Sequence, residues 1–176
     1  MKIVVLKSSP HQNGDSNTLA SYFIKGATEA GHSVCEIDVN AVPLHPCRGC
    51  QGNESGRCLF SDDIGPIETE LTDAQMVIYV TPVYFYDMSA QLKLVVDRLR
   101  CFRPNLRGKK SLLLATAYRD DDEVMSYLKA LYTGIAAYIG YEDLGVIMAR
   151  GCHSPEDVQD SVYAARAYEL GKSLTE

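Results

Sequence analysis

Features that are missing from this 176-residue sequence exclude several classes of protein. It contains no apolar run near the ~20 residues needed to cross a bilayer, and its N-terminus shows no apolar segment followed by a small-residue cleavage site. We therefore expect a cytoplasmic protein without a membrane partner. A formal net charge of −6 gives no basic excess, which disfavours nucleic acid as the main partner.

Two phosphate-binding motifs are missing from the first loop of the chain. Residues 1–6 predict a buried strand, residues 7–17 a polar loop, and a helical apolar pattern begins at Thr18. The loop has neither the lysine of GxxxxGK[ST] nor the pattern GxGxxG, which disfavours ATP and a Rossmann-bound dinucleotide. Hydroxyl and amide side chains stand there instead, directly before a helix N-terminus, and this suits a terminal monophosphate. A polar loop that only caps the helix is the alternative.

The whole chain alternates between strand and helix patterns, without repeats or low-complexity tracts. Apolar or alternating runs predict five strands: 1–6, 33–39, 74–81, 110–117 and 141–149. Helical periodicity predicts five helices: 18–30, 62–72, 88–102, 120–139 and one that starts after Ser154. This order predicts one domain over residues 1–176, with a cysteine-containing loop at 40–61. The fold class is α/β, a flavodoxin-like doubly wound five-stranded parallel sheet in the order 2-1-3-4-5, within three αβα layers.

Three loops of the predicted sheet meet where the strand order reverses, at the edge where such sheets bind ligands. They are the first loop, residues 82–87 and residues 116–119. Tyr84, Phe85 and Tyr86 give the second loop a flat amphipathic surface. A phosphate cradle beside an aromatic platform predicts a ligand with a phosphate tail and a flat head, and FMN fits both. An aromatic cluster at a subunit interface is the alternative.

The stretches SSPHQNGDSNT and TPVYFYDMSAQLKLVVDR together resemble the NADPH-dependent FMN reductase family of flavodoxin-like flavoproteins, and particularly its iron–sulfur flavoprotein branch. The resemblance covers most of residues 1–120. It implies that first-loop residues hold the FMN phosphate: Ser9, His11, Ser16, Asn17 and Thr18. It implies that second-loop residues wrap the isoalloxazine: Pro82, Val83, Tyr84, Phe85, Tyr86 and Asp87. It also implies residues near the other side of the ring: Thr116, Ala117 and Tyr118. His11 stands where family members often carry Arg, so that phosphate contact would depend on pH.

The same resemblance implies an enzyme that works as a homodimer or homotetramer. NADPH or NADH would pass a hydride to FMN, which would then reduce a small-molecule acceptor: a quinone, a nitro compound, a flavin or a metal. The cofactor carries this chemistry, so we assign no catalytic side chain. The alternative from another class is a non-enzymatic flavodoxin-type electron carrier. Such carriers are strongly acidic, whereas this chain is only moderately so.

One cysteine of the iron–sulfur branch pattern is missing. Cys47, Cys50 and Cys58 match a pattern of four closely spaced cysteines, but Asn53 stands at the third position. Since a cubane cluster or a structural zinc normally takes four ligands, we interpret the loop as the remnant of a cluster site and assign no metal. Two alternatives stay open. One is a cluster or metal with an outside ligand, such as His45 for zinc, and the other is a redox-active Cys47–Cys50 pair.

Cys101 and Arg107 fit the C-x5-R pattern of low-molecular-weight tyrosine phosphatases. That chemistry needs a strand, a loop and then a helix N-terminus, whereas this match begins at a predicted helix end and runs into a strand. It also has Pro104, and no glycine, within the loop. We therefore do not assign a phosphatase.

Overall fold

The protein is described by a computed structural model that covers residues 1–50 and 58–175, so Asn53 lies outside the described residues. Its centre is a five-stranded sheet in the order β2-β1-β3-β4-β5, in which all neighbouring strands are parallel. The strands are β1 (Lys2–Lys7), β2 (Ser33–Asp38), β3 (Met76–Pro82), β4 (Lys110–Thr116) and β5 (Glu142–Ala149). The predicted fold class and strand order are confirmed.

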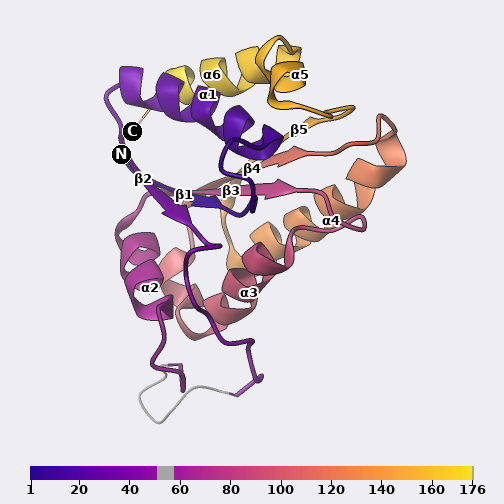
Figure 1. The fold of residues 1–176 in the computed structure, drawn as a ribbon. Helices are drawn as coiled ribbons and strands as arrows, with labels where there is room; N and C mark the ends of the chain where they lie inside the picture. The colour runs from indigo at the N-terminus through magenta and orange to yellow at the C-terminus, as the bar shows by residue number, and fades with distance from the viewer. Residues whose placement is uncertain (51–57, 176) are drawn as a thin grey trace.

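Helices cover both faces of this sheet and produce the three αβα layers (Figure 1). One face carries α1 (Asp15–Glu29), α5 (Pro155–Gln159) and α6 (Val162–Ser173). The other carries α2 (Ile64–Asp73), α3 (Ala90–Arg98) and α4 (Asp122–Ile139), with the short 3-10 turns η1 (Leu99–Cys101) and η2 (Arg103–Leu106) after α3. Within the described residues, none of these helices is long and apolar enough to cross a bilayer.

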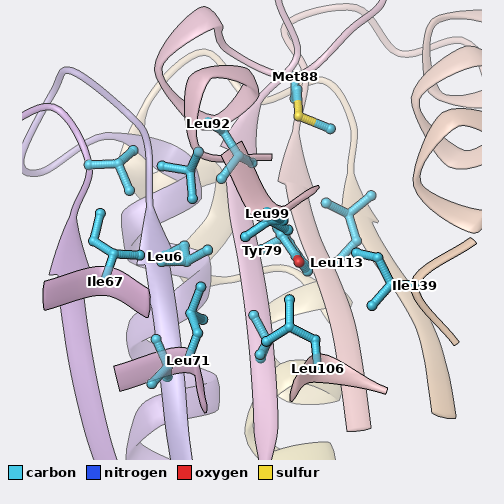
Figure 2. Packing of buried hydrophobic residues seen from close by; sticks show 14 of the residues in the cluster. Leu6, Ile67, Leu71, Tyr79, Met88, Leu92, Leu99, Leu106, Leu113 and Ile139 are labelled. Atoms are coloured by element: carbon cyan, nitrogen blue, oxygen red, sulfur yellow. The ribbon is translucent and has the colours of Figure 1, made fainter. Parts of the chain in front are cut away.

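The sheet is apolar on both faces, because alternate residues of a strand point in opposite directions. Leu6 and Tyr79 pack into the cluster beneath α2, α3 and α4, where Leu92 and Leu99 meet them (Figure 2). Ile3 and Ile78, from the same two strands, pack into the cluster beneath α1 and α6. Full burial of each such side chain contributes roughly 1.5–3 kcal/mol. This explains why β1 and β3 show continuous apolar runs instead of alternation.

Two glycines let α1 and α6 pack with their backbones in contact. A Cβ on Gly26 would lie 2.1 Å from the carbonyl oxygen of Tyr168, and one on Gly171 would lie 2.3 Å from that of Phe23. No side chain fits at such distances. The helix pair therefore depends on glycine at both positions, although neither carries a positive φ.

Two helix boundaries differ from the sequence-based prediction. The helix predicted from residue 88 begins two residues later, because Ser89 is the N-cap of α3 and its Oγ accepts from the N–H of Leu92 at 3.4 Å. The C-terminal helix is not continuous either, because α5 ends at Gln159 and Ser161 caps a new helix, α6. By contrast, α4 ends at Ile139, the predicted last residue, where Gly140 follows with φ of 86°.

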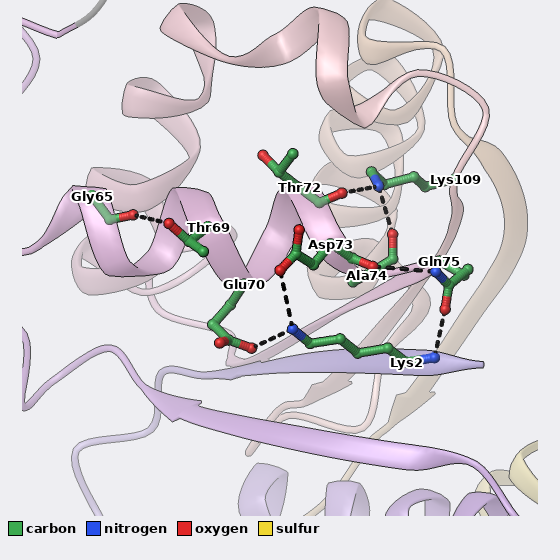
Figure 3. Close-up of polar contacts among 9 residues, drawn as sticks. All are labelled: Lys2, Gly65, Thr69, Glu70, Thr72, Asp73, Ala74, Gln75 and Lys109. Carbon is green, nitrogen blue, oxygen red and sulfur yellow. Dashed lines mark hydrogen bonds and ion pairs between the residues drawn. The ribbon is translucent and has the colours of Figure 1, made fainter.

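The amino ends of the strands are closed by charged side chains that belong to the scaffold (Figure 3). Lys2 pairs with Glu70 at 3.0 Å, and Lys109 donates to the last carbonyls of α2, those of Thr72 and Ala74, at 2.7 and 2.5 Å. A hollow opens at this edge, and both Lys109 and Lys110 line it. Lys110 also donates to a carbonyl oxygen, that of Thr175 at 2.9 Å. These ammonium groups are already paired, which argues against an anion site here.

Candidate functional site

The loop between β1 and α1 folds around the carbonyl oxygen of His11. That oxygen accepts hydrogen bonds from Ser9 Oγ at 3.2 Å, from the Gly14 N–H at 2.9 Å and from Asn17 Nδ2 at 3.0 Å. Gly14 is the N-cap of α1 and supplies no side chain to cap the helix. The first-turn N–H groups of α1 are therefore left for an acceptor that does not come from the cap residue.

Two buried oxygens beside this helix start have no partner. Ser16 Oγ and Asn17 Oδ1 make no hydrogen bond in the described structure, although Ser16 is only 1% exposed. An unpaired buried hydroxyl is costly unless a ligand completes it. Together with the free N–H groups and the positive end of the helix dipole, it forms a donor set that suits a phosphate.

The second loop is a tight turn held in an unfavourable conformation. Tyr84 and Asp87 exchange backbone hydrogen bonds of 2.9 and 3.1 Å, while Phe85 and Tyr86 between them have φ of 49° and 69°. A left-handed conformation costs roughly 1–2 kcal/mol for each such residue. Phe85 is also fully exposed, so packing does not repay this cost. Strain of this kind, beside exposed aromatic rings, is typical of a binding loop.

Buried serine and threonine side chains fix the first two loops against each other. Ser8 Oγ donates to the carbonyl of Val80 at 2.7 Å, and Ser89 Oγ donates to the carbonyl of Ser8 at 3.3 Å. The Ser89 N–H in turn donates to Thr81 Oγ1 at 2.9 Å. The ends of β1 and β3 and the start of α3 thus form one connected support beneath the site.

The loops after β4 and β5 border the site as well. The Val83 N–H donates to the carbonyl of Thr116 at 2.8 Å, and the Cys152 N–H donates to that of Ala117 at 3.0 Å. Tyr118 stacks edge-on against His153, with ring centroids 4.1 Å apart. The segment after β5 therefore reaches the same edge as the three predicted loops.

One cleft joins these loops and contains much of the predicted site. Its lining includes predicted residues from all three loops: Ser9, His11, Ser16, Pro82, Val83, Tyr84, Thr116, Ala117 and Tyr118. Five predicted residues do not line this cleft. Asn17 and Thr18 line a neighbouring hollow beside Lys7. The other three belong to the outer turn after β3: Phe85, Tyr86 and Asp87. The prediction missed several lining residues: Asn13, Gly14, Asp15, Cys152, His153 and Pro155.

Burial shapes the ionisation of two of the missed residues. Desolvation, with Asp157 as the next cause, raises the pKa of the Asp15 carboxyl at the start of α1. Desolvation likewise raises the pKa of the Cys152 thiol to about 11, so it stands in the cleft as a neutral thiol at pH 7. The cleft therefore contains one carboxyl group, that of Asp15, at the place where a phosphate would bind, and the protein disfavours its negative charge.

The cysteine loop lies elsewhere and leaves the sheet after β2. Cys47, Cys50 and Cys58 are half-buried free thiols. Across residues 1–50 and 58–175, no three His, Cys, Asp or Glu side chains are arranged to hold a metal ion as they stand. The C-x5-R match of Cys101 to Arg107 falls on η1 and η2 before β4, which is the wrong context for a phosphatase loop.

A doubly wound sheet with an anion cradle and an aromatic turn at its switch point defines the class of nucleotide-binding α/β proteins. Residues 1–139 match the family model described as NADPH-dependent FMN reductase. The chain belongs to this family. The match confirms the predicted family.

Individual relatives agree with this assignment. An iron–sulfur flavoprotein of Methanocaldococcus jannaschii is 34% identical over 104 residues, which cover 58% of this chain and 54% of that protein. An iron–sulfur flavoprotein of Archaeoglobus fulgidus is 26% identical over 183 residues, which cover all of this chain and 80% of the relative. This chain thus spans about half of the first relative and four-fifths of the second.

A solved structure shares the fold. The NAD(P)H:quinone oxidoreductase from Methanothermobacter marburgensis superposes with a TM-score of 0.77 at 17% identity, covering 100% of this chain and 96% of that one. At this identity the likeness supports the fold.

Proposed function

We propose that this chain is an FMN-dependent NAD(P)H oxidoreductase that binds FMN in the cleft at the carboxyl edge of the sheet. The observation that carries the proposal is Ser16, whose buried hydroxyl has no partner at the uncapped start of α1. When bound, FMN supplies the hydride and electron chemistry of such enzymes. The protein binds the cofactor, orients it and limits the access of water.

The phosphate would bind at the first turn of α1. Ser16 and the first-turn N–H groups are the donors. Ser9 lines the same cleft, but its hydroxyl already donates to the His11 carbonyl. His11 lines the same cleft and is exposed. Asn17 serves the loop instead, because its amide nitrogen already donates to the carbonyls of His11 and Gln12.

The ring would lie against the turn after β3. Pro82, Val83 and Tyr84 line the cleft, and the N–H groups of Phe85 and Tyr86 donate to no protein acceptor in the described structure. Free N–H groups in a rigid turn can stabilise negative charge that develops on a ring edge. Tyr118 and His153 would border the opposite side.

Electrons would come from NADPH or NADH and leave to a small-molecule acceptor, for which a quinone is the first choice. The protein from Methanothermobacter marburgensis that shares the fold is named a quinone oxidoreductase, and the two relatives described above are named flavoproteins. We also propose that a second copy of the chain covers the exposed Phe85, which would make the enzyme a homodimer or homotetramer. Light scattering of the purified protein measures this.

The decisive test compares Ser16→Ala with Ser21→Ala in an FMN titration followed by flavin fluorescence. Ser16 has no protein partner to lose and its unpaired hydroxyl is costly, so its removal does not lower the stability of the apoprotein. It removes a hydrogen bond to a charged group, worth about 1.5–3 kcal/mol, which weakens FMN binding about 10-fold to 100-fold. Ser21 lies on the exposed side of α1 and donates to the Thr18 carbonyl, so its removal leaves the affinity unchanged.

Three results would count against the proposal. Protein that is colourless and does not take up FMN contradicts the cofactor site, and equal affinities of the two variants contradict the place of the phosphate. If FMN binds but neither NADPH nor NADH reduces it anaerobically, the chain is a flavodoxin-type electron carrier instead of an NAD(P)H oxidoreductase.

A further inference from the structure

The strained turn after β3 is closed at its base by a buried hydrogen bond. Thr81 stands before the turn and Ser89 after it, and both residues are fully buried. The Ser89 N–H donates to Thr81 Oγ1 at 2.9 Å, which closes residues 82–88 into a ring. The tip is closed separately, by the backbone exchange between Tyr84 and Asp87. The turn is therefore held at two levels.

The chemistry of the Thr81 hydroxyl sets the direction of both its hydrogen bonds. A backbone N–H can only donate, so Oγ1 is the acceptor for Ser89 and keeps its own proton for another partner. That proton goes to the carbonyl oxygen of Pro82, at 2.8 Å. Pro82 lines the cleft, so Thr81 also fixes the first peptide group of the wall that the second loop gives to the site.

Ser89 is itself anchored, so its bond to Thr81 joins two fixed points. Its Oγ donates to the carbonyl of Ser8 at 3.3 Å and accepts from the Leu92 N–H at 3.4 Å. The Ser8 hydroxyl continues this chain of bonds to the carbonyl of Val80, at 2.7 Å. Thr81 belongs to a central strand and Ser89 caps a helix, so neither residue can move without breaking other bonds.

The side chains of the turn contribute little packing that could hold it. Phe85 is 100% exposed, and Tyr84 and Tyr86 are 43% and 40% exposed. Tyr86 has a ring contact, but with Tyr127, which is itself exposed. Phe85 and Tyr86 nevertheless keep positive φ. Such conformations persist only where the surrounding structure determines them more strongly than the local strain opposes them. The closures at the tip and at the base meet this condition.

We propose that Thr81 is a positioning residue for the flavin: its hydroxyl holds the turn 84–87 in the strained conformation that receives the ring, before the ring arrives. The inference rests on the proposed function, because it takes a flavin ring as the occupant of the cleft. Without the hydroxyl, the Ser89 N–H loses its acceptor and the turn relaxes in part of the molecules. The affinity for the ring then falls in proportion to the fraction of molecules that still hold the turn.

The test combines two variants with two ligands, FMN and riboflavin, which has the ring but lacks the phosphate. Thr81→Val keeps the shape of the side chain and removes its hydroxyl. We expect it to weaken both ligands about tenfold, since tenfold corresponds to about 1.4 kcal/mol and two left-handed residues store more strain than that. Ser16→Ala is expected to weaken FMN and to leave riboflavin unchanged. Thr81→Ser keeps the hydroxyl and should bind both ligands nearly as well as wild-type protein.

Ser111→Ala is the matched control for a general loss of stability. Ser111 is also fully buried, and its hydroxyl bonds to that of Tyr132 at 2.8 Å. It lies near the amino end of β4, whereas the cleft lies at the carboxyl ends of the strands. This variant should lower Tm as Thr81→Val does, but leave both flavin affinities unchanged.

The outcomes separate this inference from the proposed function. Unchanged riboflavin affinity of Thr81→Val overturns the inference, and so does an equal loss in Ser111→Ala. Wild-type protein that takes up neither flavin contradicts the proposed function, and the inference falls with it. If Ser16→Ala leaves the FMN affinity unchanged while Thr81→Val weakens both ligands, the phosphate site is misplaced but the role of Thr81 stands.

Hydrogen exchange on wild-type apoprotein covers the case in which Thr81→Val does not fold. The Ser89 amide should exchange far more slowly than the Phe85 amide, which donates to no protein acceptor in the described structure. This difference has to be present before any flavin is added. A Ser89 amide that exchanges as fast as that of Phe85, or that becomes protected only with FMN, refutes a turn held in advance by Thr81.

Discussion

The buried ion pair between Arg98 and Asp62 is expected to stabilise the fold by several kcal/mol and in a pH-dependent way. The two side chains are 1% and 7% exposed. Hydrogen bonds from Arg98 lower the pKa of Asp62 from 3.8 to about 2, although burial acts in the opposite direction. That difference, at about 1.4 kcal/mol per pKa unit, corresponds to roughly 2.4 kcal/mol in favour of the ionised, folded state.

Asp62→Asn removes the charge and keeps the shape. It leaves the Arg98 guanidinium buried without its counter-charge, and removal of one partner of a buried pair costs about 3–5 kcal/mol. For a chain of this size, this lowers Tm by about 6–20 °C. Asp97→Asn is the matched control. Asp97 pairs with Lys93 on the exposed side of α3 at 2.7 Å, and such a pair contributes only about 0.3–0.5 kcal/mol.

Denaturant unfolding at pH 7, 5 and 3 measures both effects. The folded-state pKa of Asp62 is depressed, so its contribution is complete above the unfolded value near 4 and is lost as the pH falls toward 2. The stability difference between wild-type and Asp62→Asn protein should therefore shrink as the solution becomes acidic. A cost below about 1 kcal/mol at pH 7, or a difference that does not change with pH, would refute this account of the pair.

Three other substitutions test the site and the scaffold. Gly14→Ala should weaken FMN binding, because a Cβ there lies 2.8 Å from Ser9 Oγ and 3.0 Å from the His11 carbonyl oxygen and so displaces the loop; unchanged affinity in a fluorescence titration contradicts this. Asp15→Asn should tighten FMN binding several-fold and raise stability at pH 7, because its raised pKa means that the folded state disfavours the charge; the stability gain should vanish below about pH 4, and no gain at pH 7 contradicts the assignment. Gly26→Ala should cost about 3 kcal/mol or more in denaturant unfolding, since its Cβ would lie 2.1 Å from the Tyr168 carbonyl; a neutral result contradicts the close packing of α1 and α6.

The sheet could be predicted because its physical cause is local in the sequence. β1 and β3 are buried on both faces, so their apolar runs are continuous and the turns that end them are polar or contain proline. The helix starts depend on more than the local sequence. Asp87 and Ser89 are both good N-cap residues, but the structure uses Asp87 in the turn with Tyr84, where its Oδ1 also accepts from the Met88 N–H. Ser89 is left to cap α3.

The candidate site was predicted only where a loop carries an obvious donor or aromatic pattern. Cys152 and His153 carry no such pattern, yet parallel strands bring the segment after β5 to the same edge. The topology alone could have placed them there. The contacts of Arg98 are different, because its bonds to His45 and Asp62 depend on how α3 packs, which no local pattern reveals.

Helix α3 connects the candidate cleft with the cysteine-containing loop. At its start, Ser89 bonds to Ser8 and Thr81 beneath the cleft, and at its end Arg98 holds the cysteine loop. Its nine residues span about 14 Å at 1.5 Å per residue. Because Ser89 and Arg98 are both buried and hydrogen-bonded, α3 fixes the loop segments at His45 and Asp62 relative to the candidate cleft.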